Sequence, residues 1–85
     1  MTKAKFSSAN DAFRRLLRRT RIESGMSQLD LASKLGMPQS FVSKYETGER
    51  RLDFVETILV CEALGMTIQE FAKRFSKINQ SRGEI

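Results

Sequence analysis

Apolar residues recur at intervals of three and four along most of the chain, which is the spacing that places them on one face of an α-helix. No stretch shows the alternation of apolar and polar residues that is typical of a half-buried strand. The chain is therefore expected to be all-α, with short connections. The pattern predicts five helices, near residues 9–24, 28–35, 38–47, 54–64 and 68–77.

Local signals mark the ends of these helices. A Ser, Thr or Asp followed three residues later by an acidic residue forms a capping box, which satisfies two backbone amides at a helix start. A glycine directly follows each of the first four predicted helices, where a left-handed residue commonly ends a helix. The four predicted capping boxes are Ser8/Asp11, Ser27/Asp30, Asp53/Glu56 and Thr67/Glu70.

The length of the chain allows one small domain with a modest core, because a chain of 85 residues buries only a limited fraction of its surface. The helix pattern places this domain at residues 8–78. Residues 1–7 are expected to form a flexible arm, and residues 79–85 a frayed tail. No apolar run approaches the roughly 18 residues of a membrane span, and the first residues lack the apolar region of a secretory signal. A cytoplasmic location is expected.

The composition argues against an enzyme. The sequence has no histidine and a single cysteine, so the commonest general base and the usual zinc ligands are missing. Cys61 lies within a helical apolar pattern, where a thiol behaves as a small buried hydrophobe. We expect a binding module without catalytic activity, cofactor or metal.

The positive charge is concentrated at the N-terminal end. Residues 1–25 carry seven basic and two acidic residues, which accounts for the whole net charge of +5. Such asymmetry favours a polyanionic partner, either nucleic acid or an anionic membrane surface, although a basic helix can also be a solvated face.

The predicted third helix has an unusual outward face. Val42 and Tyr45 are spaced to anchor one side, and Pro38 suits the first turn because it lacks an amide hydrogen. The opposite side is polar and nearly uncharged, which is more typical of recognition than of a solvated surface. Its residues are Gln39, Ser40, Ser43, Lys44 and Thr47.

The packing and turn residues of the second and third helices match a known pattern. The match extends to flanking residues, which are Arg21, the GMSQ stretch, Glu46, Gly48 and the EALGM stretch. The sequence resembles the Cro/repressor-type, xenobiotic-response-element class of helix-turn-helix regulators over residues 12–75. The resemblance implies a compact, five-helix, lambda-repressor-like bundle with the helix-turn-helix in helices 2 and 3. The matching packing and turn residues are Leu31, Ala32, Leu35, Gly36, Met37, Val42 and Tyr45.

The resemblance also implies a function, that of a sequence-specific, double-stranded DNA-binding transcriptional regulator, with repression as the expected output. Helix 3 would enter the major groove. The residues expected to contact bases are Gln39, Ser40, Ser43 and Lys44. Phosphate contacts are expected from Arg18, Ser27, Gln28, Thr47, Arg50 and Arg51.

Two further structural roles are expected. By the resemblance, Gln28 braces Gln39, and Arg21 forms a partly buried ion pair with Glu46. The alternative is that the polar residues expected to contact DNA are ordinary solvent-exposed surface residues.

Helices 4 and 5 contain more apolar residues than one side of a small core requires. This surplus predicts a homodimer, which would bind two half-sites of a palindromic operator about one helical turn apart. The alternative for Phe71 and Phe75 is that they close the core of the monomer over the first helix. The residues expected at the dimer interface are Leu59, Met66, Phe71 and Phe75.

Two other functions are compatible with the same residues. One is the DNA-binding antitoxin of a toxin–antitoxin pair, in which a second face covers a protein partner. The other is a protein-interaction adaptor that has kept the fold without binding DNA; the polar, non-acidic face of helix 3 argues against it.

Overall fold

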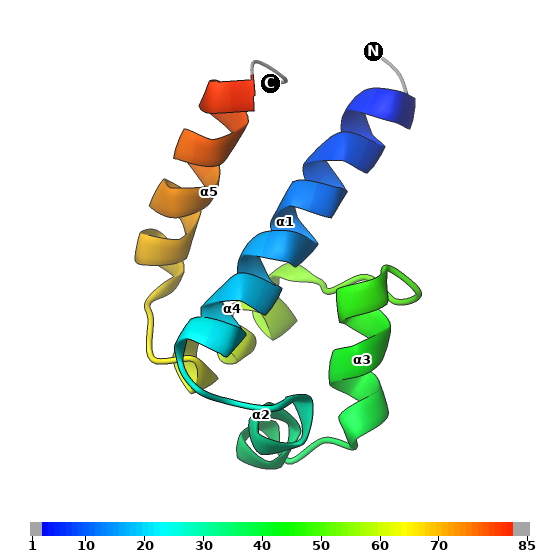
Figure 1. Ribbon diagram of the computed structural model, residues 1–85, viewed down its shortest axis with the longest axis vertical. Helices are drawn as coiled ribbons and strands as arrows, with labels where there is room; N and C mark the ends of the chain where they lie inside the picture. The colour runs from blue at the N-terminus through cyan, green and yellow to red at the C-terminus, as the bar shows by residue number, and fades with distance from the viewer. Residues whose placement is uncertain (1–2, 83–85) are drawn as a thin grey trace.

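The computed structural model describes the backbone of residues 3–82, which folds into five α-helices joined by short turns (Figure 1). Within these residues there is no strand. The predicted all-α, five-helix architecture is confirmed. The helices are α1 (Lys3–Glu23), α2 (Gln28–Leu35), α3 (Gln39–Thr47), α4 (Phe54–Ala63) and α5 (Ile68–Arg82).

The two longest helices form one side of the molecule. In Figure 1, α1 and α5 run antiparallel beside each other, and α2 and α3 lie at the end of the molecule where α1 finishes. α3 contacts both α1 and α2, while α4 packs against α2 and α5. α3 is thus held from one side only, and its other side faces outward.

The core lies where all five helices meet. Leu17, Leu31, Val42 and Cys61 are completely buried there. The prediction that Cys61 is buried is confirmed, and burial raises the pKa of its thiol to about 11. At neutral pH the thiol is therefore protonated.

Three of the four predicted capping boxes form. At the start of α2, the amide of Asp30 donates to the Ser27 hydroxyl at 3.0 Å, and the Ser27 amide donates back to the Asp30 carboxylate at 2.9 Å. These backbone and side-chain hydrogen bonds lower the pKa of Asp30. The same reciprocal pairs form between Asp53 and Glu56 and between Thr67 and Glu70.

The ends of the two long helices differ from the predicted ones. α1 begins at Lys3, so Ser8 lies inside the helix and does not cap it, and residues 3–7 are helical instead of forming an arm. α5 continues to Arg82, beyond the predicted end at residue 77. No glycine or proline interrupts either stretch, so helical hydrogen bonding can continue. Residues 1–2 and 83–85 of the predicted arm and tail lie outside the described residues.

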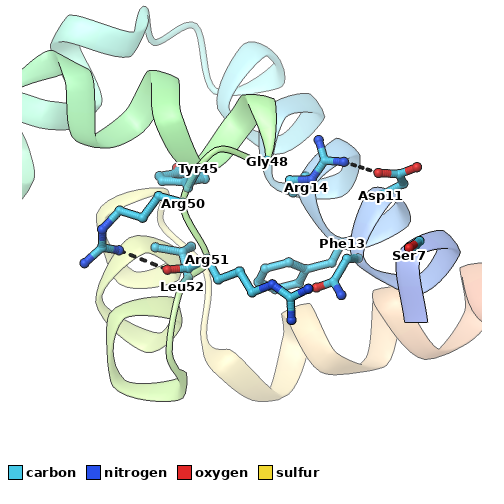
Figure 2. Close-up of a pocket in the computed structure, with 10 residues that line it drawn as sticks. Ser7, Asp11, Phe13, Arg14, Tyr45, Gly48, Arg50, Arg51 and Leu52 are labelled. Carbon is cyan, nitrogen blue, oxygen red and sulfur yellow. Dashed lines mark hydrogen bonds and ion pairs between the residues drawn. The ribbon is translucent and has the colours of Figure 1, made fainter. Parts of the chain in front are cut away.

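The C-terminal end of α3 contacts α1 through Arg14. Gly48 adopts a left-handed conformation with φ of 88°, and the Arg14 guanidinium packs directly against it (Figure 2). A Cβ atom at this position would come within 3.0 Å of Arg14 Cζ. Arg14 also donates to the Glu46 carbonyl oxygen at 3.2 Å and pairs with Asp11. The left-handed backbone conformation favours glycine at this position, and a larger residue would also require the Arg14 guanidinium to shift.

Candidate nucleic-acid interface

The corner between α2 and α3 is tight because its residues close it locally. Gly36 ends α2 in the left-handed region with φ of 67°, and the Met37 amide donates back to the Ala32 carbonyl oxygen at 2.9 Å. Pro38 precedes α3, and no side chain caps the helix start. Ala32 and Val42 are completely buried at the crossing. α3 is therefore set rigidly on α2, with its first amides uncapped by a side chain.

The structure gathers the predicted base-contacting residues on one outward face of α3. Gln39, Ser40 and Lys44 are exposed, and Ser43 is half-buried. The Ser43 hydroxyl donates to the Ser40 carbonyl oxygen at 3.4 Å, and Thr47 makes a similar bond to the Lys44 carbonyl oxygen at 3.1 Å. The face offers amide, hydroxyl and ammonium groups together.

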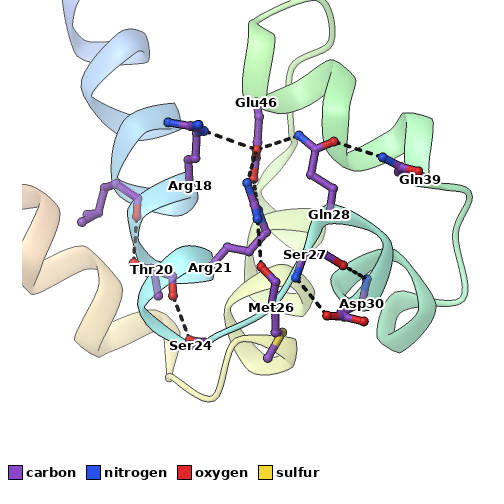
Figure 3. A network of polar contacts seen from close by, with 11 residues as sticks. Arg18, Thr20, Arg21, Ser24, Met26, Ser27, Gln28, Asp30, Gln39 and Glu46 are labelled. Atoms are coloured by element: carbon purple, nitrogen blue, oxygen red, sulfur yellow. Dashed lines mark hydrogen bonds and ion pairs between the residues drawn. The ribbon is translucent and has the colours of Figure 1, made fainter.

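A buried ion pair connects α1 with α3 (Figure 3). Arg21 donates through Nε to Glu46 Oε2 at 2.7 Å and through Nη2 to Glu46 Oε1 at 3.0 Å. The Arg21 side chain is 9 % exposed and that of Glu46 is 3 % exposed. Hydrogen bonding to Glu46 raises the pKa of Arg21, and a further bond to the Met26 carbonyl oxygen at 2.8 Å satisfies Nη1. The residues that the resemblance paired are thus in direct contact.

This ion pair continues outward to the surface of α3. Gln28 donates through Nε2 to Glu46 Oε1 at 3.0 Å, and Gln39 donates through Nε2 to Gln28 Oε1 at 3.3 Å (Figure 3). A carboxylate can only accept, so the NH₂ group of Gln28 must face Glu46 and its oxygen must face Gln39. The orientation of the Gln39 amide is fixed in turn, because only its NH₂ group can donate to that oxygen.

The predicted phosphate-contacting residues flank this face. Ser27 lies at the start of α2, where its hydroxyl accepts the Asp30 amide. Arg18 is 61 % exposed, and its Nε lies 4.0 Å from Glu46 Oε1. Arg51 is exposed in the connection between α3 and α4. Arg18 and Arg51 therefore each present a positive charge to solvent.

Arg50 is directed differently from its neighbour. Its guanidinium donates to both oxygens of Glu56, at 3.1 and 2.7 Å, and lies 4.8 Å from the centre of the Phe41 ring. The side chain thus joins α3 to the start of α4. The spacing of six residues across a helix start does not reveal this pairing from the sequence. The phosphate contact expected of Arg50 stays a prediction.

The Arg50–Glu56 pair makes stability depend on pH. Hydrogen bonding to Arg50 lowers the pKa of Glu56 below its ordinary value. The pair therefore stabilises the fold above the pKa of an unfolded glutamate, and this contribution is lost as the pH falls through the lowered value. Glu56→Gln should lower the melting temperature at neutral pH and have little effect in acid.

Thermal melts of both proteins across the acid range measure this difference. Glu62→Gln, which removes an exposed carboxylate from the same helix, is the control and should show no such dependence. A Glu56→Gln deficit that persists unchanged at acid pH would contradict the role of the charge.

The structure corrects the expectation for Phe71. Phe71 is 3 % exposed, and its ring makes an edge contact with Phe13 at 5.7 Å, so it closes the core of the monomer and offers no dimer surface. Phe75 is half-buried against the same ring at 6.1 Å. Met66 is also half-buried, whereas Leu59 is 52 % exposed. Of the four predicted interface residues, Leu59 presents the clearest free surface.

An apolar groove was not predicted from the sequence. It has a volume of about 490 Å³ and lies between α1, α4 and α5. Phe6 and Phe54 line it and are 63 % and 68 % exposed. Phe54 is the first residue of α4 and lies beyond the edge of the core.

Comparison with known proteins identifies the class of this domain. A helix-turn-helix family model matches residues 17–71. A solved structure described as an XRE-family like protein from Pseudomonas syringae pv. tomato str. DC3000 is 36 % identical, with a TM-score of 0.85, over 91 % of this chain and 94 % of that chain. The chain therefore belongs to the XRE-type helix-turn-helix family of DNA-binding regulators, as its resemblance indicated. A search of curated proteins finds no match.

The described part of the chain lacks the features of two other kinds of site. None of its helices is both long and apolar enough to cross a membrane. Nor do residues 3–82 bring together three or more of the His, Cys, Asp or Glu side chains that could hold a metal ion.

Proposed function

We propose that this protein is a sequence-specific transcriptional repressor that recognises double-stranded operator DNA through α3 in the major groove. Family membership indicates a DNA-binding regulator in general. The proposal adds that α3 is the recognition surface, that binding is sequence-specific and that the protein represses transcription. It involves no catalytic activity or cofactor. The proposed location is the cytoplasm, where the DNA that it would bind is accessible.

The observation that carries the proposal is the fixed orientation of the Gln39 amide. Its NH₂ group has two hydrogens, and the bond to Gln28 uses one of them. The other hydrogen can donate to adenine N7, while the amide oxygen can accept from adenine N6. The buried Arg21–Glu46 pair holds this arrangement through Gln28. The glutamine is therefore preorganised for adenine before DNA arrives.

Phosphate contacts would position α3 in the groove without specifying the sequence. Arg18 and Arg51 supply exposed guanidinium groups, and Ser27 supplies a hydroxyl at the start of α2. We assign this role to Arg51 in preference to Arg50, because Glu56 already engages the Arg50 guanidinium.

The test of the proposed function is selection of binding sites from a pool of random DNA duplexes. The proposal expects enrichment of one half-site sequence that contains adenine, arranged with two-fold symmetry. Enrichment of no sequence above the starting pool would contradict specific recognition.

We also propose that two copies bind together through α4. Val55 and Leu59 lie one helical turn apart and are 62 % and 52 % exposed, so they form an apolar stripe on this helix. One recognition helix contacts only a few base pairs, and a two-fold dimer doubles the recognised sequence. Leu59→Glu should dissociate the dimer and abolish cooperative occupation of paired half-sites without unfolding the protein.

Sedimentation at micromolar concentration, with and without DNA, measures this effect. Ile22→Glu is the matched control, because Ile22 is equally exposed, at 52 %, but lies on α1. It should leave the dimer intact. A wild-type protein that stays monomeric and fills both half-sites independently would disprove the dimer.

A further inference from the structure

Aromatic rings of different exposure line the apolar groove between α1, α4 and α5. Phe13 and Phe75 are half-buried and contact each other edge to face, with their ring centres 6.1 Å apart. Phe6 and Phe54 line the same groove with most of their surface in solvent. A soluble monomer seldom leaves a large contiguous apolar patch in contact with water, and such a patch commonly marks a site for a partner.

The apolar surface continues from the groove onto the outward side of α4. Seven of the ten residues of this helix are apolar, but only two of the seven are buried. Ile58 is half-buried one helical turn after Phe54, so it connects the groove with the exposed stripe of Val55 and Leu59. A helix that is apolar around most of its circumference is normally covered on most sides. The outward side of α4 is therefore expected to be covered.

The size of this surface indicates how large its partner must be. The stripe consists of two aliphatic side chains, which cover far less than the roughly 800 Å² per partner of a standard protein interface. Each exposed aromatic ring can add about 150–250 Å². The stripe alone is therefore too small for a stable dimer, whereas the stripe, the two exposed rings and the groove together approach the required area.

The same surface has both of the shapes that a two-fold contact requires. In such a contact an identical patch of each copy meets the other, so the patch must contain projecting groups and a recess that accepts them. Phe6 and Phe54 project into solvent, and the groove of about 490 Å³ is the recess. Among the described residues, no Lys or Arg lines the groove, so the positive charges of two copies of this basic chain are not brought together there.

We propose that a second copy of this chain covers the groove, with the two grooves facing each other across a two-fold axis. Phe6 and Phe54 of each copy are then buried against the other copy, together with the apolar stripe of α4. This proposal rests on the proposed α4 dimer and extends its interface to α1. Phe6 precedes residues 17–71, which the family model matches, so membership of the family does not imply this contact.

Sedimentation equilibrium of the full chain, with and without DNA, measures the contribution of the groove. Phe6→Ser is the test variant, because Phe6 lies on α1 outside the stripe and is too exposed to be needed by the monomer fold. Loss of one buried ring should weaken association about tenfold, and a two-fold dimer loses two, so its dissociation constant should rise about 100-fold. Leu29→Ser, a similarly exposed apolar residue on α2, is the control and should leave the dimer unchanged.

Isotope-filtered NOE spectra of labelled and unlabelled chains mixed together test the contact directly and need no variant. They should connect the ring of Phe6 or Phe54 in one copy with apolar residues of the groove or stripe in the other. A folded dimer that shows none of these contacts between copies would overturn the proposal.

The sedimentation results also separate this proposal from the proposed function. If Phe6→Ser dimerises like the wild type while Leu59→Glu dissociates, the groove is not part of the interface, and the α4 dimer stands without it. A wild-type protein that stays monomeric with and without DNA would overturn both dimer proposals. Recognition of DNA by α3 would be unaffected by either result, because selection of binding sites tests it separately.

Discussion

Glu46→Gln should lower the free energy of unfolding by about 3–5 kcal/mol, because it leaves the buried Arg21 guanidinium without its counter-charge. Glu46 is the centre of the network, with Arg21 and Gln28 as its hydrogen-bond partners. A domain of this size has a total stability of only about 5–15 kcal/mol, so the variant should be severely destabilised. Denaturant unfolding measures the change. Variant protein that remains folded should also lose affinity for its DNA site, since Gln28 no longer holds Gln39.

Glu49→Gln is the matched control for this experiment. It removes the same charge from an exposed position just beyond α3. The control should change the unfolding free energy by less than about 1 kcal/mol, as expected of an exposed charge. An equally small effect of Glu46→Gln would show that the ion pair contributes no more than a surface pair.

Gln39→Ala should weaken binding to the selected DNA site by about 1–3 kcal/mol per half-site, or about 5- to 150-fold. The physical reason is the loss of two hydrogen bonds to one adenine. Preference should relax at that base pair alone, because the other residues of α3 keep their positions. The fold should be unaffected, since Gln39 is exposed.

Competition binding with duplexes that differ at each position of the half-site measures this effect. Gln69→Ala, an exposed glutamine on α5, is the control and should preserve both affinity and preference. If Gln39→Ala lowers the affinity for every sequence equally, the residue has no role in base recognition.

The short helices could be predicted closely from the sequence because local signals determine their ends. α2 matches the predicted range, and its capping box and terminal glycine both form as expected. Three capping boxes depend only on side chains three residues apart, so tertiary structure has little influence on them. The orientation of the Gln39 amide could not be predicted from local signals in the sequence. It depends on a chain of contacts that joins residues 21, 46, 28 and 39 across three helices.

The features that the sequence did not predict correctly depend on how the helix continues or on packing between distant parts of the chain. Ser8 and Asp11 have the spacing of a capping box, but the helix passes through them because no residue interrupts it. Phe71 has the apolar periodicity expected of either a core or an interface, and only its contact with Phe13 in α1 decides between them. The Arg50–Glu56 pair likewise cannot be predicted from local spacing, because it depends on the path of the loop between α3 and α4. Periodicity shows which residues share a face but not what covers it.

The central claim is specific recognition of double-stranded DNA, and the ratio of two affinities tests it most directly. The dissociation constants for the selected operator and for a scrambled duplex of equal length should be measured at the same salt concentration, because phosphate contacts make both values depend on salt. The account predicts that the operator binds at least about 1,000-fold more tightly. Equal affinity for the two duplexes would contradict it.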